Sequence, residues 1–123
     1  MSDTEKLFKH AGIHFLVAIT ALSMWAAADT WYLVTELALA NFLSVATAVV
    51  AGAAISTVIH EWFHYAGANV SGSTYTIPEK TGFFVYDFDY KESSEAQFRT
   101  MSYAGQLGSA VSVIGLLMLV PVD

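Results

Sequence analysis

Three long stretches without a charged side chain constrain this chain more than any other feature of its sequence. The windows 11–28, 37–59 and 100–122 contain no Asp, Glu, Lys or Arg. A helix that crosses a bilayer needs about 17–25 mostly apolar residues. All three windows reach that length, so the sequence predicts three transmembrane helices.

The composition agrees with a membrane environment. Hydrophobic residues make up 55% of the chain and charged residues 13%, whereas soluble domains carry about 25% charged residues. A chain of 123 residues cannot hide that much apolar surface in one small core, so lipid or partner protein must cover it. We predict a mainly α-helical, membrane-embedded single domain over residues 1–123, with spans at about 11–28, 38–66 and 101–121.

The first window has a second interpretation, a secretory signal peptide within residues 1–28. Ala26, Ala27 and Ala28 resemble a cleavage site. The weak positive flank and His14, which interrupts the apolar run, favour a retained transmembrane helix instead.

Charge and cysteine content exclude several classes of function. The formal net charge is −6, and no basic patch is present to neutralise phosphates, so we expect no nucleic-acid partner. The sequence has no cysteine, which excludes disulfides, thiolate catalysis and cysteine-ligated metals.

The basic residues predict an orientation in the membrane. All of them flank the first window or follow the second one, at Lys6, Lys9, Lys80, Lys91 and Arg99. The connection between the first two windows has none. By the positive-inside rule, the N-terminus and the segment 69–99 face the cytoplasm. We therefore expect an integral protein of a prokaryotic cytoplasmic membrane with a cytoplasmic N-terminus.

The segment between the second and third windows has a different pattern. Aromatic residues occupy every second position of 84–90, which is typical of a strand. A shorter β-like run at 74–77 and turn residues at 78–82 precede it. We predict a β-hairpin over about 74–90, which must be interfacial or covered by protein because its edges are unpaired. An ordinary cytoplasmic loop is the alternative.

The residues that predict chemistry are His60, Glu61 and His64, in the pattern His-Glu-x-x-His. On a helix, the two histidines lie one turn apart on the same face and can both reach a single Zn²⁺ ion. The glutamate is then placed as a general base that takes a proton from a metal-bound water. The alternative is an interfacial group of polar residues at a helix end that binds no metal.

The helix around the motif predicts which way the histidines point. Ala53 and Gly67 share their face, and such small residues allow close helix packing. Trp62 falls on the opposite side, where we expect lipid or the interface. The histidines should therefore face the interior of the bundle.

The pattern resembles the site-2 protease family of intramembrane zinc metalloproteases. In that family a β-rich membrane segment follows the motif helix, and the next span opens with an Ala-Gly-Pro-x-x-Asn-like motif. Here the segment 104–109 reads Ala-Gly-Gln-Leu-Gly-Ser, with Gln106 for proline and Ser109 for asparagine. A small-residue packing face on the third helix explains the same residues. The resemblance covers residues 40–120 and implies a zinc-dependent metalloendopeptidase.

The third zinc ligand is not identified. The family takes it from the aspartate of a later Leu-Asp-Gly-like motif, which this sequence lacks, and catalytic zinc sites use three protein ligands. Either the chain is a truncated member or the ligand comes from elsewhere, with His14, Asp87 and Asp89 as candidates. His10 and His14 also lie one turn apart, so four histidines converge if the first two helices are antiparallel.

Two functions therefore compete. The first is hydrolysis of membrane-embedded or membrane-adjacent peptides, with zinc on His60 and His64 and Glu61 as the base. The alternative is a non-proteolytic membrane protein that binds a metal or haem through paired His-x-x-x-His motifs. Three spans enclose a site poorly, so we also expect partner helices or a homo-oligomer.

Overall fold

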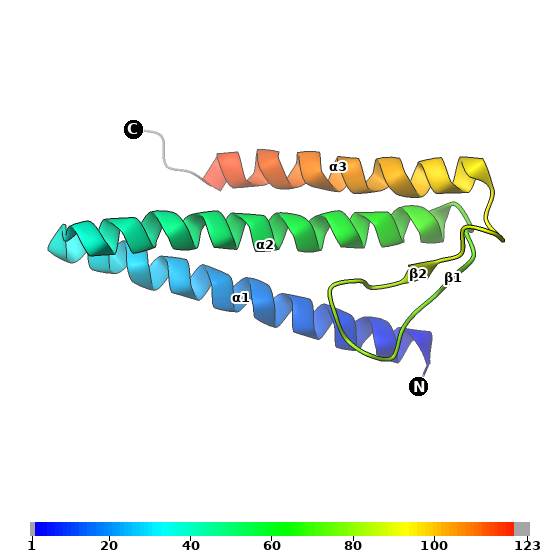
Figure 1. Ribbon diagram of the computed structural model, residues 1–123, viewed down its shortest axis with the longest axis horizontal. Coiled ribbons are helices and arrows are strands. Elements are labelled where there is room, and N and C mark those ends of the chain that lie inside the picture. The colour runs from blue at the N-terminus through cyan, green and yellow to red at the C-terminus, as the bar shows by residue number, and fades with distance from the viewer. Residues whose placement is uncertain (1, 120–123) are drawn as a thin grey trace.

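The computed structural model describes residues 2–119 and is built from three long helices (Figure 1). Each helix is long and apolar enough to cross a membrane. A two-stranded antiparallel sheet lies between the second and third helices. The prediction of three transmembrane helices with a small hairpin is confirmed. The elements are α1 (Asp3–Thr35), α2 (Ala38–Val70), β1 (Tyr75–Thr76), β2 (Asp87–Phe88) and α3 (Glu95–Leu119).

The helices extend beyond the charge-free windows. The 33 residues of α1 and the 33 of α2 each correspond to about 50 Å of helix, against about 30 Å of hydrocarbon. Helical hydrogen bonding therefore continues into the polar flanks, which a hydropathy argument alone does not include. Residues 120 and 121 of the third predicted span lie outside the described residues.

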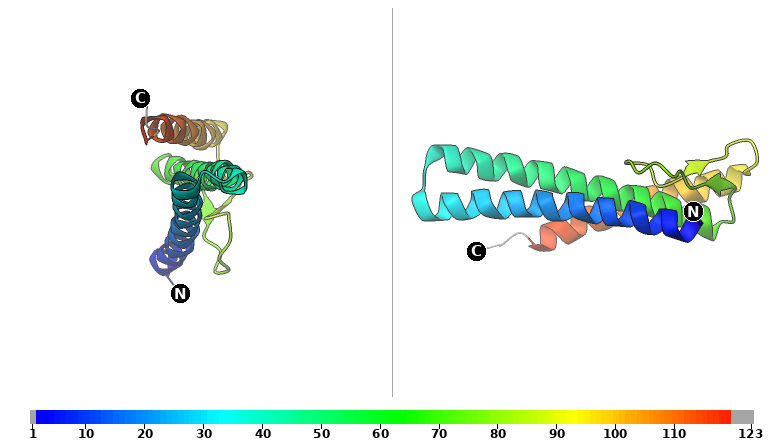
Figure 2. Two further views of the ribbon diagram at one scale, coloured as in Figure 1. Left: turned by 90° about the vertical axis from the view of Figure 1, so that its left-hand side faces the viewer. Right: turned by 90° about the horizontal axis from the view of Figure 1, so that it is seen from below.

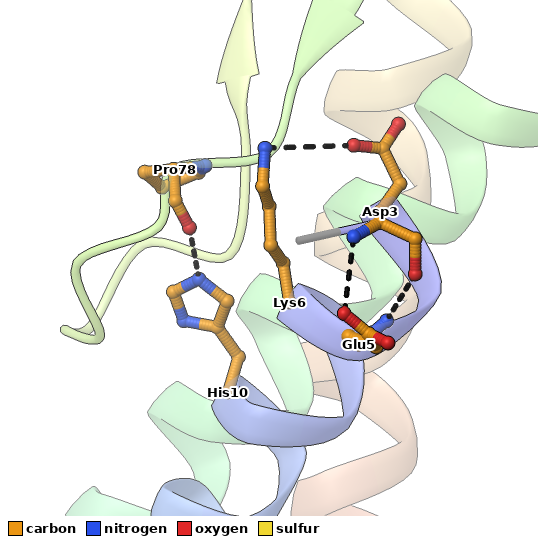
Figure 3. Close-up of polar contacts among 6 residues, drawn as sticks. Asp3, Glu5, Lys6, His10 and Pro78 are labelled. Carbon is orange, nitrogen blue, oxygen red and sulfur yellow. Dashed lines mark hydrogen bonds and ion pairs between the residues drawn. The ribbon is translucent and has the colours of Figure 1, made fainter.

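The ends of α1 have clear local causes. The Ser2 hydroxyl accepts from the Glu5 N–H and the Glu5 carboxylate accepts from the Ser2 N–H, both at 3.2 Å, which forms a capping box. Lys6 pairs with Asp3 in the same turn at 3.8 Å, as Figure 3 shows. At the other end Glu36 adopts the left-handed conformation, with φ of 56°, and donates its N–H to the Tyr32 carbonyl. That turn sends α2 back along α1.

The middle helix is α2, and α1 and α3 pack against it from two sides (Figures 1 and 2). The segment 71–94, which contains both strands, lies beside the N-terminal part of α1 (Figure 1). The N-terminus and this segment are therefore at the same end of the molecule, as the sequence predicts.

The strands are shorter than the alternating pattern predicts. Only two residue pairs are formed, Tyr75 with Phe88 and Thr76 with Asp87. Val85 and Tyr86 are adjacent in sequence yet both are buried, which a regular strand with one covered face does not allow. This part of the segment packs against α2, so it does not form the regular strand that the alternating aromatic residues predict.

The buried apolar core of the described residues lies where the segment 71–94 covers the helices. Ala68 of α2, Met101 of α3 and the segment's Ile77, Val85 and Tyr86 form it. Elsewhere most large apolar side chains of the helices are exposed. Lipid would cover those surfaces, and outside this core the buried apolar side chains of the helices are small, such as Ala40 and Ala51.

Candidate metal centre

The His-Glu-x-x-His motif lies at this enclosed end, near the C-terminus of α2. Its residues point in three directions. His60 and His64 face α3, Glu61 faces the segment 71–94, and Trp62 faces α1. Trp62 lies on the side of α2 away from the motif histidines, as predicted, but it packs against α1 instead of facing lipid, because its indole N–H donates to a buried histidine of α1.

The two motif histidines meet through their outer nitrogens. The Nε2 atoms of His60 and His64 are 2.8 Å apart, and the ring planes are nearly perpendicular at 87°. The predicted shared face is confirmed. At that separation the two nitrogens are hydrogen-bonded to each other, and a zinc ion between them would replace this hydrogen bond and take two of its four ligands from the histidines.

The inner nitrogens are held by α3. His64 Nδ1 lies 2.8 Å from the Met101 carbonyl oxygen, and His60 Nδ1 lies 2.7 Å from Ser109 Oγ. A carbonyl only accepts hydrogen bonds, so Nδ1 of His64 carries the proton and Nε2 presents its lone pair. Metal-binding histidines are usually oriented in this way by their second nitrogen. The donor chemistry and its support therefore suit zinc, for two of the required ligands.

Small residues of α3 make this contact possible. A Cβ at Gly105 would overlap the His64 imidazole, and a Cβ at Gly108 would lie 2.7 Å from the Phe63 Cβ. The imidazole therefore rests on the backbone of α3 and reaches the Met101 carbonyl one turn earlier. Gly105, Gly108 and Ser109 of the segment 104–109 face the motif helix, so this part of α3 is a packing surface.

The proposed third ligands do not complete the site. Among residues 2–119, no group of three His, Asp or Glu side chains is arranged to hold a metal. Asp89 caps its own turn, since its Oδ1 accepts from the N–H groups of Lys91 and Glu92 at 3.0 Å. Asp87 is exposed on β2 but lines the same pocket as Glu61 and His64.

The four histidines do not converge on one point. The expectation that His10 and His14 of α1 join the motif histidines is therefore wrong. His10 Nε2 lies 3.0 Å from the Pro78 carbonyl oxygen (Figure 3), and His14 Nε2 lies 2.9 Å from the Gly82 carbonyl oxygen. Both rings are buried against the segment 71–94. The helices α1 and α2 are antiparallel as expected. However, His10 and His14 form hydrogen bonds with carbonyl groups of the segment 71–94 instead of pointing toward His60 and His64.

Glu61 is buried and lies at the edge of a pocket. It is only 4% exposed, and its Oε1 accepts from the Val85 N–H at 3.1 Å. The pocket has a volume of about 530 Å³. Besides Glu61, His64 and Asp87 it is lined mainly by aromatic residues, among them Phe84, Tyr86, Phe88, Tyr90 and Phe98. A carboxylate and an imidazole thus share a space large enough for part of a peptide.

Tyr86 adds a neutral donor to this pocket. Burial, together with the nearby Glu61 carboxylate and Tyr90, raises the pKa of the Tyr86 hydroxyl above its ordinary value. The phenol therefore stays protonated at neutral pH and can donate a hydrogen bond. The alternating aromatic pattern of 84–90 predicts only a strand face for Tyr86 and does not indicate that it lines a pocket with Glu61.

Ser109 provides a direct test of the histidine support. We expect Ser109→Ala to weaken zinc binding by about 10–100-fold, because His60 loses the partner of its Nδ1. Ser112→Ala is the matched control, since the Ser112 hydroxyl bonds only to the Gly108 carbonyl of its own helix at 2.8 Å. Zinc competition titrations on the two purified variants measure the effect. Equal affinities would show that Ser109 does not orient His60.

Comparison with known proteins does not identify a family for this chain. No protein-family model matches the chain, and neither the curated proteins nor the solved structures contain a match. The functional inference therefore depends on the site.

Proposed function

We propose that this chain is an intramembrane zinc metalloprotease that hydrolyses peptide bonds of membrane-embedded or membrane-adjacent substrates. The observation that carries the proposal is the meeting of the His60 and His64 Nε2 atoms at 2.8 Å beside a pocket that Glu61 lines. The family resemblance of residues 40–120 points to the same reaction.

Each residue has a distinct role in this proposal. His60 and His64 bind zinc through Nε2, and Ser109 and the Met101 carbonyl hold their other nitrogens. Zinc, when bound, supplies a Lewis acid that polarises a peptide carbonyl and acidifies water. Glu61 accepts the proton of the attacking water and returns it to the leaving amine. The Tyr86 hydroxyl is available as a hydrogen-bond donor to the substrate.

Two sources remain for the third ligand. The first is Asp87, which shares the pocket with His64 and would have to move inward with β2. The second is a carboxylate or imidazole of a further helix, from a longer form of this chain, from a partner protein or from a second copy of the chain. Asp87→Asn distinguishes them, because it lowers zinc affinity only in the first case.

Zinc content tests the proposal first. The full chain, purified in lipid nanodiscs and equilibrated with zinc, is expected to retain about one zinc ion per chain. His60→Ala and His64→Ala should lose that zinc, whereas His10→Ala should keep it because His10 binds the Pro78 carbonyl instead. Elemental analysis of the four preparations provides the measurement. A wild-type chain without zinc under these conditions would rule out the proposed function.

Hydrolysis is the second requirement. The zinc-loaded chain is co-reconstituted with a pool of single-span transmembrane peptides, and mass spectrometry identifies new termini. Cleavage should disappear with a zinc chelator and return when zinc is added again. Zinc binding without any cleavage would favour a non-proteolytic metal protein.

A further inference from the structure

Trp62, the third residue of the motif, makes an unexpected contact with α1. Its Nε1 donates to His14 Nδ1 at 2.8 Å, and the two rings meet edge to face. The indole N–H can only donate, so His14 Nδ1 must accept. The proton of the neutral His14 ring is then on Nε2, which donates to the Gly82 carbonyl at 2.9 Å.

The series of hydrogen bonds continues from His14 through the segment 71–94 and returns to α2. Three residues after Gly82, the N–H of the fully buried Val85 donates to Glu61 Oε1 at 3.1 Å. Trp62 and Glu61 are neighbours in the chain. A closed path therefore runs from α2 to α1, from α1 to the segment, and from the segment to the carboxylate beside its starting point.

Both nitrogens of His14 are engaged in this path by an indole N–H and a backbone carbonyl, whereas His60 and His64 each turn one nitrogen toward the other. The ring is 5% exposed and lies between a donor that cannot accept and a carbonyl that cannot donate. A different role for His14 follows from this arrangement. His14 fixes the place of Gly82, and through it the Val85 amide that holds one oxygen of Glu61.

We propose that His14 is a positioning residue for the Glu61 carboxylate, and that Trp62 sets its tautomer. The catalytic meaning of this proposal rests on the proposed function, in which Glu61 is the general base. Glu61 has one hydrogen bond, to a backbone amide of a segment with little regular structure. Anchoring that segment on a buried ring of α1 keeps the carboxylate in one orientation relative to the histidines. A small displacement of a reacting group reduces the rate by up to about 100-fold.

His10 offers an internal comparison. It binds the same segment at Pro78, further along the chain from Val85, and its buried Nδ1 has no hydrogen-bond partner among residues 2–119. Loss of His10 removes an anchor of the segment but leaves the Gly82 and Val85 contacts in place. The two α1 histidines therefore differ in their expected effect on Glu61.

Amide exchange tests the proposal without any need for catalysis. Hydrogen exchange of the Val85 amide is measured by NMR on the full-length, isotope-labelled chain in nanodiscs. His14→Phe should speed this exchange about ten-fold, as expected when one hydrogen bond in the path is lost. His14→Gln, whose amide both donates and accepts, should remain close to wild type, and so should His10→Phe. An unchanged Val85 rate in His14→Phe would overturn the proposal.

The wild-type chain provides a second measurement in case His14→Phe does not fold. The ¹⁵N spectrum of the imidazoles should show a neutral His14 with its proton on Nε2. Trp62→Phe should remove that preference, and Trp31→Phe, which changes an exposed tryptophan of α1, should preserve it. A doubly protonated ring, or a proton on Nδ1, would contradict the assigned path.

Cleavage assays separate this proposal from the protease proposal. If the wild type cleaves the peptide pool, His14→Phe should lower kcat by about 10–100-fold with little change in KM, and His14→Gln should restore most of it. A wild-type kcat in His14→Phe would overturn the positioning role and leave the protease intact. A wild-type chain that cleaves nothing would overturn the protease alone, because exchange and ¹⁵N spectra report the His14 contact directly.

Discussion

Replacing Glu61 by Gln is expected to abolish peptide hydrolysis and to leave zinc in place. The Gln side chain has the same shape and its carbonyl oxygen can still accept from the Val85 N–H. It cannot accept a proton from water at neutral pH, and loss of a general base costs about 10²–10⁴-fold in rate. Single-turnover cleavage of the best substrate from the peptide pool, with zinc content measured on the same sample, provides the test.

The matched control is Glu79→Gln, which neutralises an exposed carboxylate of the same segment. It should cleave at the wild-type rate, because Glu79 lies outside the pocket around Glu61. If Glu61→Gln cleaves as fast as Glu79→Gln, Glu61 is not the base and the assignment of roles in this site is wrong.

The helices could be predicted from the sequence because lipid imposes one simple requirement. Long windows without charge must be covered by hydrocarbon, and only a helix satisfies its own backbone there. The ends of the helices were harder to predict from the sequence. Residues 3–10 and 67–70 lie beyond the predicted spans and are helical, because outside the hydrocarbon a helix needs only hydrogen bonds and caps, such as the Ser2 capping box.

The spacing of the motif predicted one side of the site. Helical geometry alone brings His60 and His64 together and directs Glu61 elsewhere. The hydrogen-bond partners of the two histidines could not be predicted from spacing. The Met101 carbonyl and Ser109 belong to α3, whose register against α2 depends on packing. Close contacts at Gly67, Gly105 and Gly108 set that register, and a stripe of small residues gives no indication of which turn meets which.

The contact between Trp62 and His14 shows the limit of a rule based on residue preference. Aromatic residues at helix ends often lie at the lipid interface, and that rule placed Trp62 there. In the structure a buried histidine of α1 accepts from its indole N–H. Most buried polar atoms have a hydrogen-bond partner, so pairing of the polar groups at this end, rather than hydropathy, would have been the informative signal.

The second large effect is expected at two glycines in the contact between α2 and α3, Gly105 of α3 and Gly67 of α2. A Cβ at Gly105 would overlap the His64 imidazole, which is the end of a side chain and can rotate away. Gly105→Ala should therefore fold but bind zinc far more weakly, since the ring is pushed off the α3 backbone and loses the Met101 carbonyl. Zinc titration and the thermal unfolding midpoint, both in nanodiscs, provide the measurements.

Gly67→Ala should lose stability as well as zinc, unlike Gly105→Ala, because its new Cβ meets atoms that cannot rotate away. It would lie 2.5 Å from the Ala104 Cβ and 3.0 Å from both the Met101 Cα and the Thr100 carbonyl oxygen. The two helices must separate to admit it, which costs about 1–3 kcal/mol of stability and draws Ser109 and Met101 away from both histidines together. A lower unfolding midpoint should accompany the loss of zinc in Gly67→Ala and be nearly absent in Gly105→Ala. If both variants lose stability equally while keeping zinc, the close packing of α3 against α2 does not hold the metal centre.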